Sequence, residues 1–259
     1  MNVIGIIPAR LAASRFPGKP LAKILGIPMI GHCYHRTKLA LGSLSTYVAT
    51  CDEEIAHYIE SIAGNVVMTS SEHTRATTRT AEALEYIEKK HKEKIDIIVM
   101  VQGDEPLITP DAIRNILPNF HDSSVEIVNI MTRLQSYEQF ADRNNVKVVV
   151  NHKSDALYFS REPIPSPWKG VDDFSMYMQT GIIAFRKEAL LKFNLMDETL
   201  LEQIESIDMN RVLESGGSVR MMPIESYTLG IDTVEELSHA EMIMKNDITL
   251  ERYSDSKQK

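Results

Sequence analysis

Three cationic side chains stand close together in one loop near the N-terminus. Arg10, Arg15 and Lys19 follow an apolar, β-branched run that stops at Pro8, and mostly small residues separate them. A loop that follows a strand of an open parallel sheet lies at the carboxyl edge of that sheet, where such folds bind ligands. An arginine fork and a lysine ammonium both bind phosphate oxygens. The loop is therefore predicted to bind a polyphosphate; the alternative for such a run is a solvated basic turn.

Two aspartates occupy a second kind of position, directly after an apolar run. Asp104 stands in the motif Gln-Gly-Asp-Glu-Pro, and Asp232 stands in a similar Gly-Ile-Asp-Thr motif far along the chain. Two carboxylates that converge on a triphosphate make a site for Mg²⁺, which proteins hold by one or two carboxylates together with phosphate oxygens and water. The alternatives are a turn-capping role for Asp104 and an N-cap role for Asp232.

Two common nucleotide-binding motifs are missing from the sequence. The N-terminal loop lacks the G-x-x-x-x-G-K-[ST] spacing of a P-loop, and no G-x-G-x-x-G occurs. These motifs supply the phosphate cradle of P-loop enzymes and of dinucleotide-binding domains. A kinase-like or dinucleotide-binding function therefore loses its main support.

Composition narrows the class of protein further. The 259 residues can bury a full core, and 43% of them are hydrophobic. The net charge of −8 argues against nucleic acid or anionic membrane as a partner, because both call for a basic surface. Cys33 and Cys51 are too few for a disulfide framework, and no apolar run approaches the length of a membrane span. A soluble, cytoplasmic protein is expected.

Apolar runs bounded by turn residues alternate with amphipathic stretches. This alternation is typical of a parallel sheet covered by helices, so an α/β, Rossmann-like fold is predicted. The expected strands are 3–8, 46–50, 66–69, 95–101, 127–132 and 146–150. The expected helices are 28–41, 53–63, 78–92, 110–120, 200–214 and 234–245, with Thr109 as the cap of the fourth.

The pattern changes between about residues 156 and 185. Three prolines and Gly170 break this stretch into short apolar pieces. We interpret it as an inserted excursion with edge strands. The chain is therefore predicted to form a single domain, 1–259, with this excursion and a frayed tail at 254–259.

The loop from Pro8 to Leu21 and the motif from Gln102 to Pro106 together resemble those of the 3-deoxy-manno-octulosonate cytidylyltransferase (CMP-Kdo synthetase) family. The likeness covers nearly the whole chain. It includes the segments 48–50, 146–149, 156–161, 202–211 and 232–233. The resemblance implies a nucleotide-diphospho-sugar transferase fold of the glycosyltransferase-A type, with a mostly parallel sheet flanked by helices and an inserted dimerisation excursion.

The resemblance also implies an activity and a set of site residues. A member of this family is a Mg²⁺-dependent enzyme that transfers CMP from CTP to a 2-keto-3-deoxy sugar acid, Kdo or a close analogue, and releases pyrophosphate for lipopolysaccharide biosynthesis. The matched positions divide into catalytic residues that hold the triphosphate, residues of the nucleoside pocket, and metal ligands. They are, in that order, Arg10, Arg15 and Lys19; Ala9, Ser14 and Gln102; and Asp104 and Asp232.

The chain departs from the family pattern in the part assigned to the acceptor. Arg75-Ala76 replaces the usual Ser-Gly pair, Thr78 replaces an acid, Gln179 replaces a histidine and Met209 replaces a glutamine. Buried polar groups left unpaired cost about 1–3 kcal/mol each, so such changes shift selectivity. The alternative is drift at solvent-facing positions. The acceptor-binding candidates are Arg75, Arg79, Gln179, Glu202, Glu205 and Met209.

Two rival functions follow from these departures and from the fold. The first is a cytidylyltransferase for another acid, such as an amino-deoxy octulosonate, a nonulosonate or a phosphonate. The second is a non-catalytic nucleotide-binding regulator, which the intact Asp104, Asp232 and Lys19 argue against. By resemblance a homodimer formed through the excursion is expected, and Trp168 is predicted to pack or to contact a subunit rather than to stack on a ligand.

Overall fold

Two compact units make up the chain. The structure, a computed structural model, describes residues 1–12, 16–168, 170 and 174–254. The first unit contains Met1–Asn115 and Thr228–Lys259, and the second contains Ile116–Tyr227. The expected excursion at 156–185 falls inside the second unit. The division into one domain with an excursion stays a prediction.

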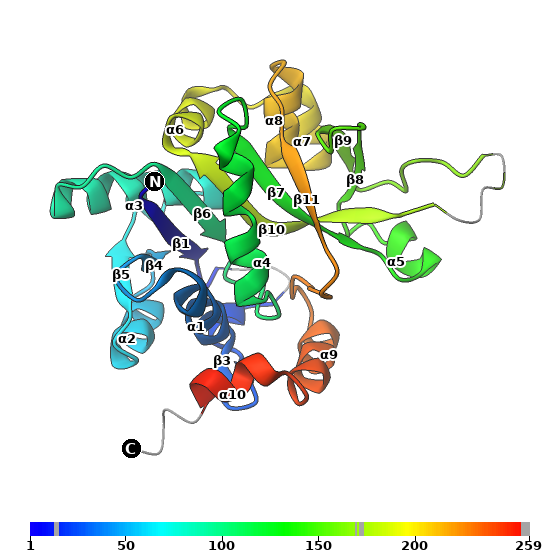
Figure 1. Cartoon of the computed structure of the whole chain (residues 1–259). Coiled ribbons are helices and arrows are strands. Elements are labelled where there is room, and N and C mark those ends of the chain that lie inside the picture. Colours follow the sequence, from blue (N-terminus) through cyan, green and yellow to red (C-terminus); the bar gives the residue numbers. More distant parts are fainter. Residues whose placement is uncertain (13–15, 169, 171–173, 255–259) are drawn as a thin grey trace. The chain divides into compact units, whose positions relative to one another are not determined.

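A parallel sheet forms the centre of the first unit (Figure 1). Strand β1 (Val3–Ala9) lies between β6 (Ile97–Val101) and β4 (Thr46–Thr50), and β5 (Asn65–Met68) pairs with β4. All three pairings are parallel, and most of the β-branched side chains of these strands are buried. The four strands expected in this region are confirmed, because a continuous apolar run suits a strand that is covered on both faces.

Helices and a short ribbon surround this sheet. The helices are α1 (Met29–Leu41), α2 (Glu53–Ser61), α3 (Ala76–His91), α4 (Pro110–Asn115) and a 3₁₀ turn at Lys19–Leu21, and β2 (Lys23–Ile24) pairs with β3 (Ile27–Pro28). Helix α1 packs tightly on β1, since a Cβ added to Gly5 would lie 2.6 Å from Cγ2 of Thr37. The predicted helices at 28–41, 53–63 and 78–92 are confirmed to within a few residues.

The fourth predicted helix is shorter than expected. Thr109 Oγ1 accepts a hydrogen bond of 3.2 Å from the amide of Ala112, so the predicted cap is confirmed. The α-helix ends at Asn115, and a 3₁₀ turn covers Leu117–His121. Pro118 explains the difference, because proline has no N–H and cannot continue an α-helical ladder.

The C-terminal part of the first unit contains α9 (Val234–Met244) and α10 (Ile248–Ser254). Thr233 caps α9 by accepting a hydrogen bond of 3.1 Å from the amide of Glu236, so the alternative that Asp232 is the N-cap is wrong. Helix α10 was not expected. It is held by tertiary contacts, since its Tyr253 is buried and its hydroxyl lies 2.8 Å from Nδ1 of His32. Most of the predicted frayed tail, 255–259, lies outside the described residues.

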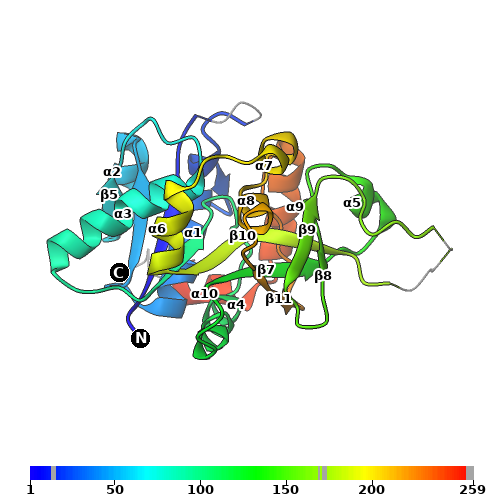
Figure 2. The ribbon, with the colours of Figure 1, turned by 90° about the horizontal axis from the view of Figure 1, so that it is seen from above.

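A mixed sheet forms the second unit. Strand β7 (Ile127–Arg133) pairs antiparallel with β10 (Tyr177–Arg186) and parallel with β11 (Arg220–Ile224). Strands β8 (Lys147–Val150) and β9 (Ala156–Ser160) form an antiparallel pair (Figure 2), and β8 also pairs with β10. The helices are α5 (Tyr137–Ala141), α6 (Lys187–Leu195), α7 (Leu200–Glu205) and α8 (Asp208–Glu214).

Two expectations for the second unit need correction. The excursion does not consist only of short pieces, because it ends in the ten-residue strand β10, whose register shifts between Gln179 and Ile183. The single helix expected at 200–214 is two helices. Ser206 separates them with a φ of 54°, a left-handed conformation that ends the first helix. None of the described helices combines the length and the apolar character that a membrane crossing needs.

The buried His32 makes folding of the first unit sensitive to pH. Its Nε2 lies 2.9 Å from the carbonyl of Ile24 and therefore donates, while Nδ1 accepts from the Tyr253 hydroxyl, so the ring is neutral. Burial, with smaller contributions from Arg36 and His35, lowers the pKa of His32 from 6.5 to about 4. Below the ordinary pKa the unfolded chain binds a proton that the folded chain does not, so this contribution to stability is lost as the pH falls.

We expect the free energy of unfolding to fall by about 2 kcal/mol more in the wild-type protein than in His32→Gln between about pH 7 and about pH 5. Glutamine can donate to the Ile24 carbonyl and accept from Tyr253 without titrating. Urea unfolding at several pH values measures the difference. The window lies above the ordinary pKa of carboxyl groups, and both proteins contain the same other histidines, so the difference between the two curves reports His32. Parallel curves for the two proteins would show that His32 is not the titrating group.

Candidate nucleotide and metal site

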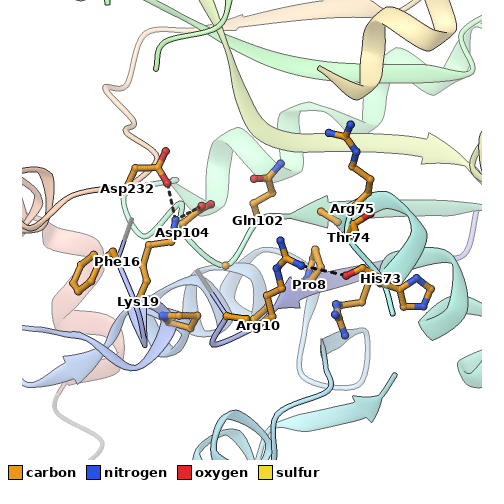
Figure 3. Close-up of a pocket in the computed structure, with 16 residues that line it drawn as sticks. Pro8, Arg10, Phe16, Lys19, His73, Thr74, Arg75, Gln102, Asp104 and Asp232 are labelled. Atoms are coloured by element: carbon orange, nitrogen blue, oxygen red, sulfur yellow. Dashed lines mark hydrogen bonds and ion pairs between the residues drawn. The ribbon is translucent and has the colours of Figure 1, made fainter. Parts of the chain in front are cut away.

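A pocket of about 320 Å³ opens in the first unit where β1 and β6 end. Its lining comes from four parts of the chain that are distant in sequence: the end of β1 with the loop after it, the segment that leads into α3, the turn after β6, and Asp232 before α9. The carboxyl ends of neighbouring parallel strands meet at one edge of a sheet, which explains why these loops come together. Figure 3 shows Asp104, Asp232 and Lys19 together at one end of the pocket and Arg10, His73 and Arg75 towards the other.

Lys19 lies between two carboxylates at one end of this pocket (Figure 3). Its Nζ is 2.8 Å from Oδ2 of Asp104 and 2.9 Å from Oδ1 of Asp232. The Lys19 side chain is only 12% exposed, and those of the two aspartates are 26% and 31% exposed. Burial by itself lowers the pKa of Lys19, but the two carboxylates outweigh it and the net pKa is raised. The ammonium therefore stays charged and balances part of the negative charge.

Arginines gather at the other end of the pocket. Arg10 Nη1 donates to the carbonyl of His73 over 3.4 Å. Arg79 is buried, and its Nη1 donates to Oγ1 of Thr69 and, over 3.2 Å, to the carbonyl of Ser70. Among the described atoms, Arg79 Nη2 is buried and has no hydrogen-bond partner. This end of the pocket is thus suited to an acceptor-rich ligand.

Contacts of both ring nitrogens hold His73 in place. Nδ1 lies 3.0 Å from the hydroxyl of Thr78, and Nε2 pairs with Glu82. Burial raises the pKa of Glu82, but the amide of Ser70 and the His73 ring outweigh it, so the net pKa of Glu82 is lowered. The carbonyl that binds Arg10 therefore belongs to a residue anchored on the first turns of α3.

The acidic end fits a Mg²⁺ ion that is shared with a ligand. No group of three or more His, Cys, Asp or Glu side chains that could bind a metal occurs in the part of the chain that the structure describes. A closed, all-protein metal cage is therefore not formed there. Mg²⁺ commonly uses one or two carboxylates and completes its shell with phosphate oxygens and water, which matches the pair Asp104 and Asp232.

The sequence and the fold both match known proteins. A family model described as cytidylyltransferase matches residues 4–226. A 3-deoxy-manno-octulosonate cytidylyltransferase from Syntrophotalea carbinolica is 39% identical over 250 residues, which cover 93% of this chain and 98% of that protein. The chain belongs to the 3-deoxy-manno-octulosonate cytidylyltransferase family. A relative of the same description from Escherichia coli is 34% identical over 243 residues, 94% of this chain and 96% of that one.

Solved structures support the same family and fold. A CMP:2-keto-3-deoxy-manno-octonic acid synthetase complexed with CTP superposes with a TM-score of 0.83 at 33% identity, over 95% of this chain and 99% of that chain. A glucose-1-phosphate thymidylyltransferase described as putative, from Bacillus anthracis, shares the fold alone, with a TM-score of 0.67 at 16% identity. The nucleotidyltransferase fold predicted from the sequence is confirmed.

The structure brings together most of the side chains that the sequence assigned to the nucleotide and the metal. Ser14 and Arg15 lie outside the described residues. The pocket is lined by the remaining members of that set, namely Ala9, Arg10, Lys19, Gln102, Asp104 and Asp232. Phe16, His73 and Thr74 also line it and were not among the predicted site residues. The available signal was their place in the sequence, because Phe16 lies in the cationic loop and His73 and Thr74 directly precede the acceptor candidate Arg75.

The acceptor candidates are divided between the two units. Arg75 and Arg79 line the pocket of the first unit. Gln179, Glu202, Glu205 and Met209 belong to the second unit, so their predicted place in one acceptor pocket with Arg75 stays a prediction.

Buried contacts hold several of the second-unit candidates. Both carboxylate oxygens of Glu202 accept from Arg211 at 2.6 Å, which joins α7 to α8. Glu205 accepts from Oγ of Ser160 at 2.6 Å and from the amide of Arg161 at 2.9 Å, which joins α7 to β9. Met209 is 1% exposed, so drift at a solvent-facing position does not explain this residue.

We expect Lys19→Met to make the first unit respond to magnesium without nucleotide. Removing the ammonium leaves two partly buried carboxylates that repel each other, and Mg²⁺ can then relieve the repulsion. Millimolar MgCl₂ should raise the Tm of Lys19→Met by several degrees more than that of the wild type. For a chain of this size, each kcal/mol of added stability raises the Tm by about 2–4 °C. Differential scanning fluorimetry measures this shift.

Two controls accompany the magnesium shift. NaCl at matched ionic strength separates binding from general screening. The double variant Lys19→Met/Asp232→Asn has one carboxylate fewer and should lose the extra response. Equal magnesium responses of Lys19→Met and the wild type would show that the two carboxylates do not form a cation site.

Proposed function

We propose that the protein transfers CMP from CTP to the anomeric hydroxyl of 3-deoxy-manno-octulosonate and releases pyrophosphate. The observation that supports this most is the convergence of Asp104 and Asp232 on Lys19, in a pocket that also contains Arg10. Relatives 34–40% identical are described as cytidylyltransferases for this acid, and a solved relative binds CTP. The family and the geometry therefore support the same reaction.

The bond changes are those of a nucleotidyl transfer. The anomeric oxygen of the acceptor forms a bond to the α-phosphorus of CTP, and the bond from that phosphorus to the oxygen bridging the α- and β-phosphates breaks. The hydroxyl proton is lost to solvent or to a basic group, and the bridging oxygen leaves on pyrophosphate. No covalent bond to the protein is required, so positioning and charge stabilisation supply the catalysis.

Cationic residues of the pocket act on the leaving group. Lys19, whose raised pKa keeps it protonated, and Arg10 are placed to neutralise charge that grows on pyrophosphate as the bond breaks. Asp104 and Asp232 would hold Mg²⁺, which acts as a Lewis acid on phosphate oxygens when it is bound. Ala9 and Gln102 would contact the nucleoside, and Arg79 would offer its buried, unpaired Nη2 to the ligand.

The cellular setting extends this proposal. Cytoplasmic localisation, a role in lipopolysaccharide precursor synthesis and a homodimer are proposed from the family likeness. Trp168, in the predicted excursion, is 90% exposed, and an exposed tryptophan is typical of a surface that a partner covers. Light scattering of the wild type and of Trp168→Ser would test the dimer, and a monomeric wild type would contradict it.

We expect Asp104→Asn and Asp232→Asn each to lower kcat about 100-fold or more, on the scale of removing one important electrostatic stabiliser. Pyrophosphate release from CTP and Kdo in the presence of Mg²⁺ measures the activity. The Tm of each variant must be compared, because each aspartate also bonds to Lys19 in the folded protein. A folded Asp232→Asn variant with near-normal turnover would remove this residue from the mechanism, and a wild type that binds CTP but releases no pyrophosphate would favour the regulator.

We expect the wild type to use Kdo with a kcat/KM of about 10⁴ M⁻¹s⁻¹ or above, which is the usual range for enzymes. A screen of amino-deoxy octulosonate, nonulosonate and phosphonate acids under the same conditions tests the acceptor. The double variant Arg75→Ser/Ala76→Gly is the matched comparison. If a different acid is preferred and this variant shifts the preference towards Kdo, Arg75 sets the acceptor; no shift would place Arg75 outside acceptor selection.

A further inference from the structure

A contact outside the pocket joins the two segments that present the metal-binding carboxylates. Oγ1 of Thr228 donates to Oε2 of Glu105 over 2.8 Å. Both side chains are buried, with Glu105 4% and Thr228 1% exposed. Glu105 directly follows Asp104, and Thr228 lies four residues before Asp232. The Glu105–Thr228 contact therefore connects the neighbourhoods of two aspartates that are far apart in the sequence.

A backbone hydrogen bond runs beside this contact. The amide of Ile231 donates to the carbonyl of Asp104 over 2.9 Å, so the residue before one aspartate is bound to the backbone of the other. Gly230 lies beside the same carboxylate, since a Cβ built there would be at an ordinary contact distance of 3.7 Å from Oε1 of Glu105. One side-chain bond and one backbone bond thus align the turn after β6 with the segment that leads into α9.

The energetic balance favours a specific role for this pair. A buried carboxylate that loses a hydrogen bond is left with an unmet acceptor, which is far costlier than the loss of an exposed bond. Glu105 is only 4% exposed, so water cannot readily replace the Thr228 hydroxyl. Loss of the hydroxyl should therefore loosen the segment 228–232 from the turn that holds Asp104, and the two carboxylates should then be less well aligned.

We propose that Glu105 and Thr228 are positioning residues that hold Asp104 and Asp232 at the separation needed to bind one divalent cation. They act through their neighbours, since neither lines the pocket. The consequence for catalysis rests on the proposed Mg²⁺-dependent transfer, whereas the consequence for the structure of segment 228–232 does not. The two consequences can therefore be tested separately.

The first experiment measures hydrogen exchange of the protein without nucleotide or metal. In Thr228→Val, which keeps the volume and removes the hydroxyl, the Ile231 amide should exchange about 10-fold faster or more, as expected from losing a bond to a buried charged group. Thr228→Ser keeps the hydroxyl and should restore slow exchange. Ser238→Ala removes an exposed hydroxyl bond in α9 and is the matched control, expected to leave Ile231 unchanged.

The second experiment measures the Mg²⁺ concentration that gives half-maximal pyrophosphate release, and Mn²⁺ binding to the protein with CTP by electron paramagnetic resonance. Thr228→Val and Glu105→Ala should raise the Mg²⁺ midpoint and weaken Mn²⁺ binding by about 10-fold or more, as seen when groups that orient metal ligands are removed. Saturating Mg²⁺ should return most of kcat. A general loss of folding would instead lower kcat at every Mg²⁺ concentration and would appear in the Tm.

The outcomes separate failure of this inference from failure of the proposed function. Unchanged Ile231 exchange and an unchanged Mg²⁺ midpoint in Thr228→Val overturn the positioning role, even if the wild type is fully active. A wild type without pyrophosphate release overturns the proposed reaction, while the exchange data still decide whether the contact holds the segment. If Glu105→Ala does not fold, Thr228→Val and its Thr228→Ser control decide the question alone.

Discussion

An ammonium group between two carboxylates is the contact around which the first unit is arranged. Lys19 bonds to Asp104 and Asp232, which come from distant parts of the sequence. Two carboxylates this near to each other in a partly buried pocket repel strongly unless a cation lies between them. Each of the three segments that carry these residues must therefore be held in place by the fold behind it.

Helix α1 provides much of that support. Arg36 is fully buried, and its Nη1 donates to the carbonyls of Leu107 and Ile108, just after the turn that carries Asp104. Its Nη2 pairs with Asp247, in the segment between α9 and α10. Burial by itself raises the pKa of Asp247, but the Arg36 guanidinium outweighs it, so the net pKa is lowered. Arg36 thus connects the C-terminal segment to the residues that follow the Asp104 turn. Its buried charge is balanced because its N–H groups donate to carbonyls and to one carboxylate.

The second unit also contains a buried cationic side chain, with different partners. Lys147 is fully buried in β8, and its ammonium donates to the carbonyls of Asp142 and Arg161. Burial lowers the pKa of Lys147, with partial compensation by nearby acids. Such groups are retained only where the chain supplies acceptors with good geometry. Together with the Glu202–Arg211 pair, they fix the relative placement of β8, β9, α7 and α8 within this unit.

The sequence alone was enough to predict the parallel strands of the first unit, most helices over them, and the loops that line the pocket, because apolar periodicity and strand-end positions are local signals. It did not predict α10, the break at Ser206 or the length of β10, since these depend on partners far along the chain. The resemblance to a known family implied the reaction and the roles of the two aspartates as metal ligands. Only the tertiary structure decided that Lys19 lies between them and that Thr228 contacts Glu105, because contacts between residues 85 or more positions apart leave no trace in local spacing.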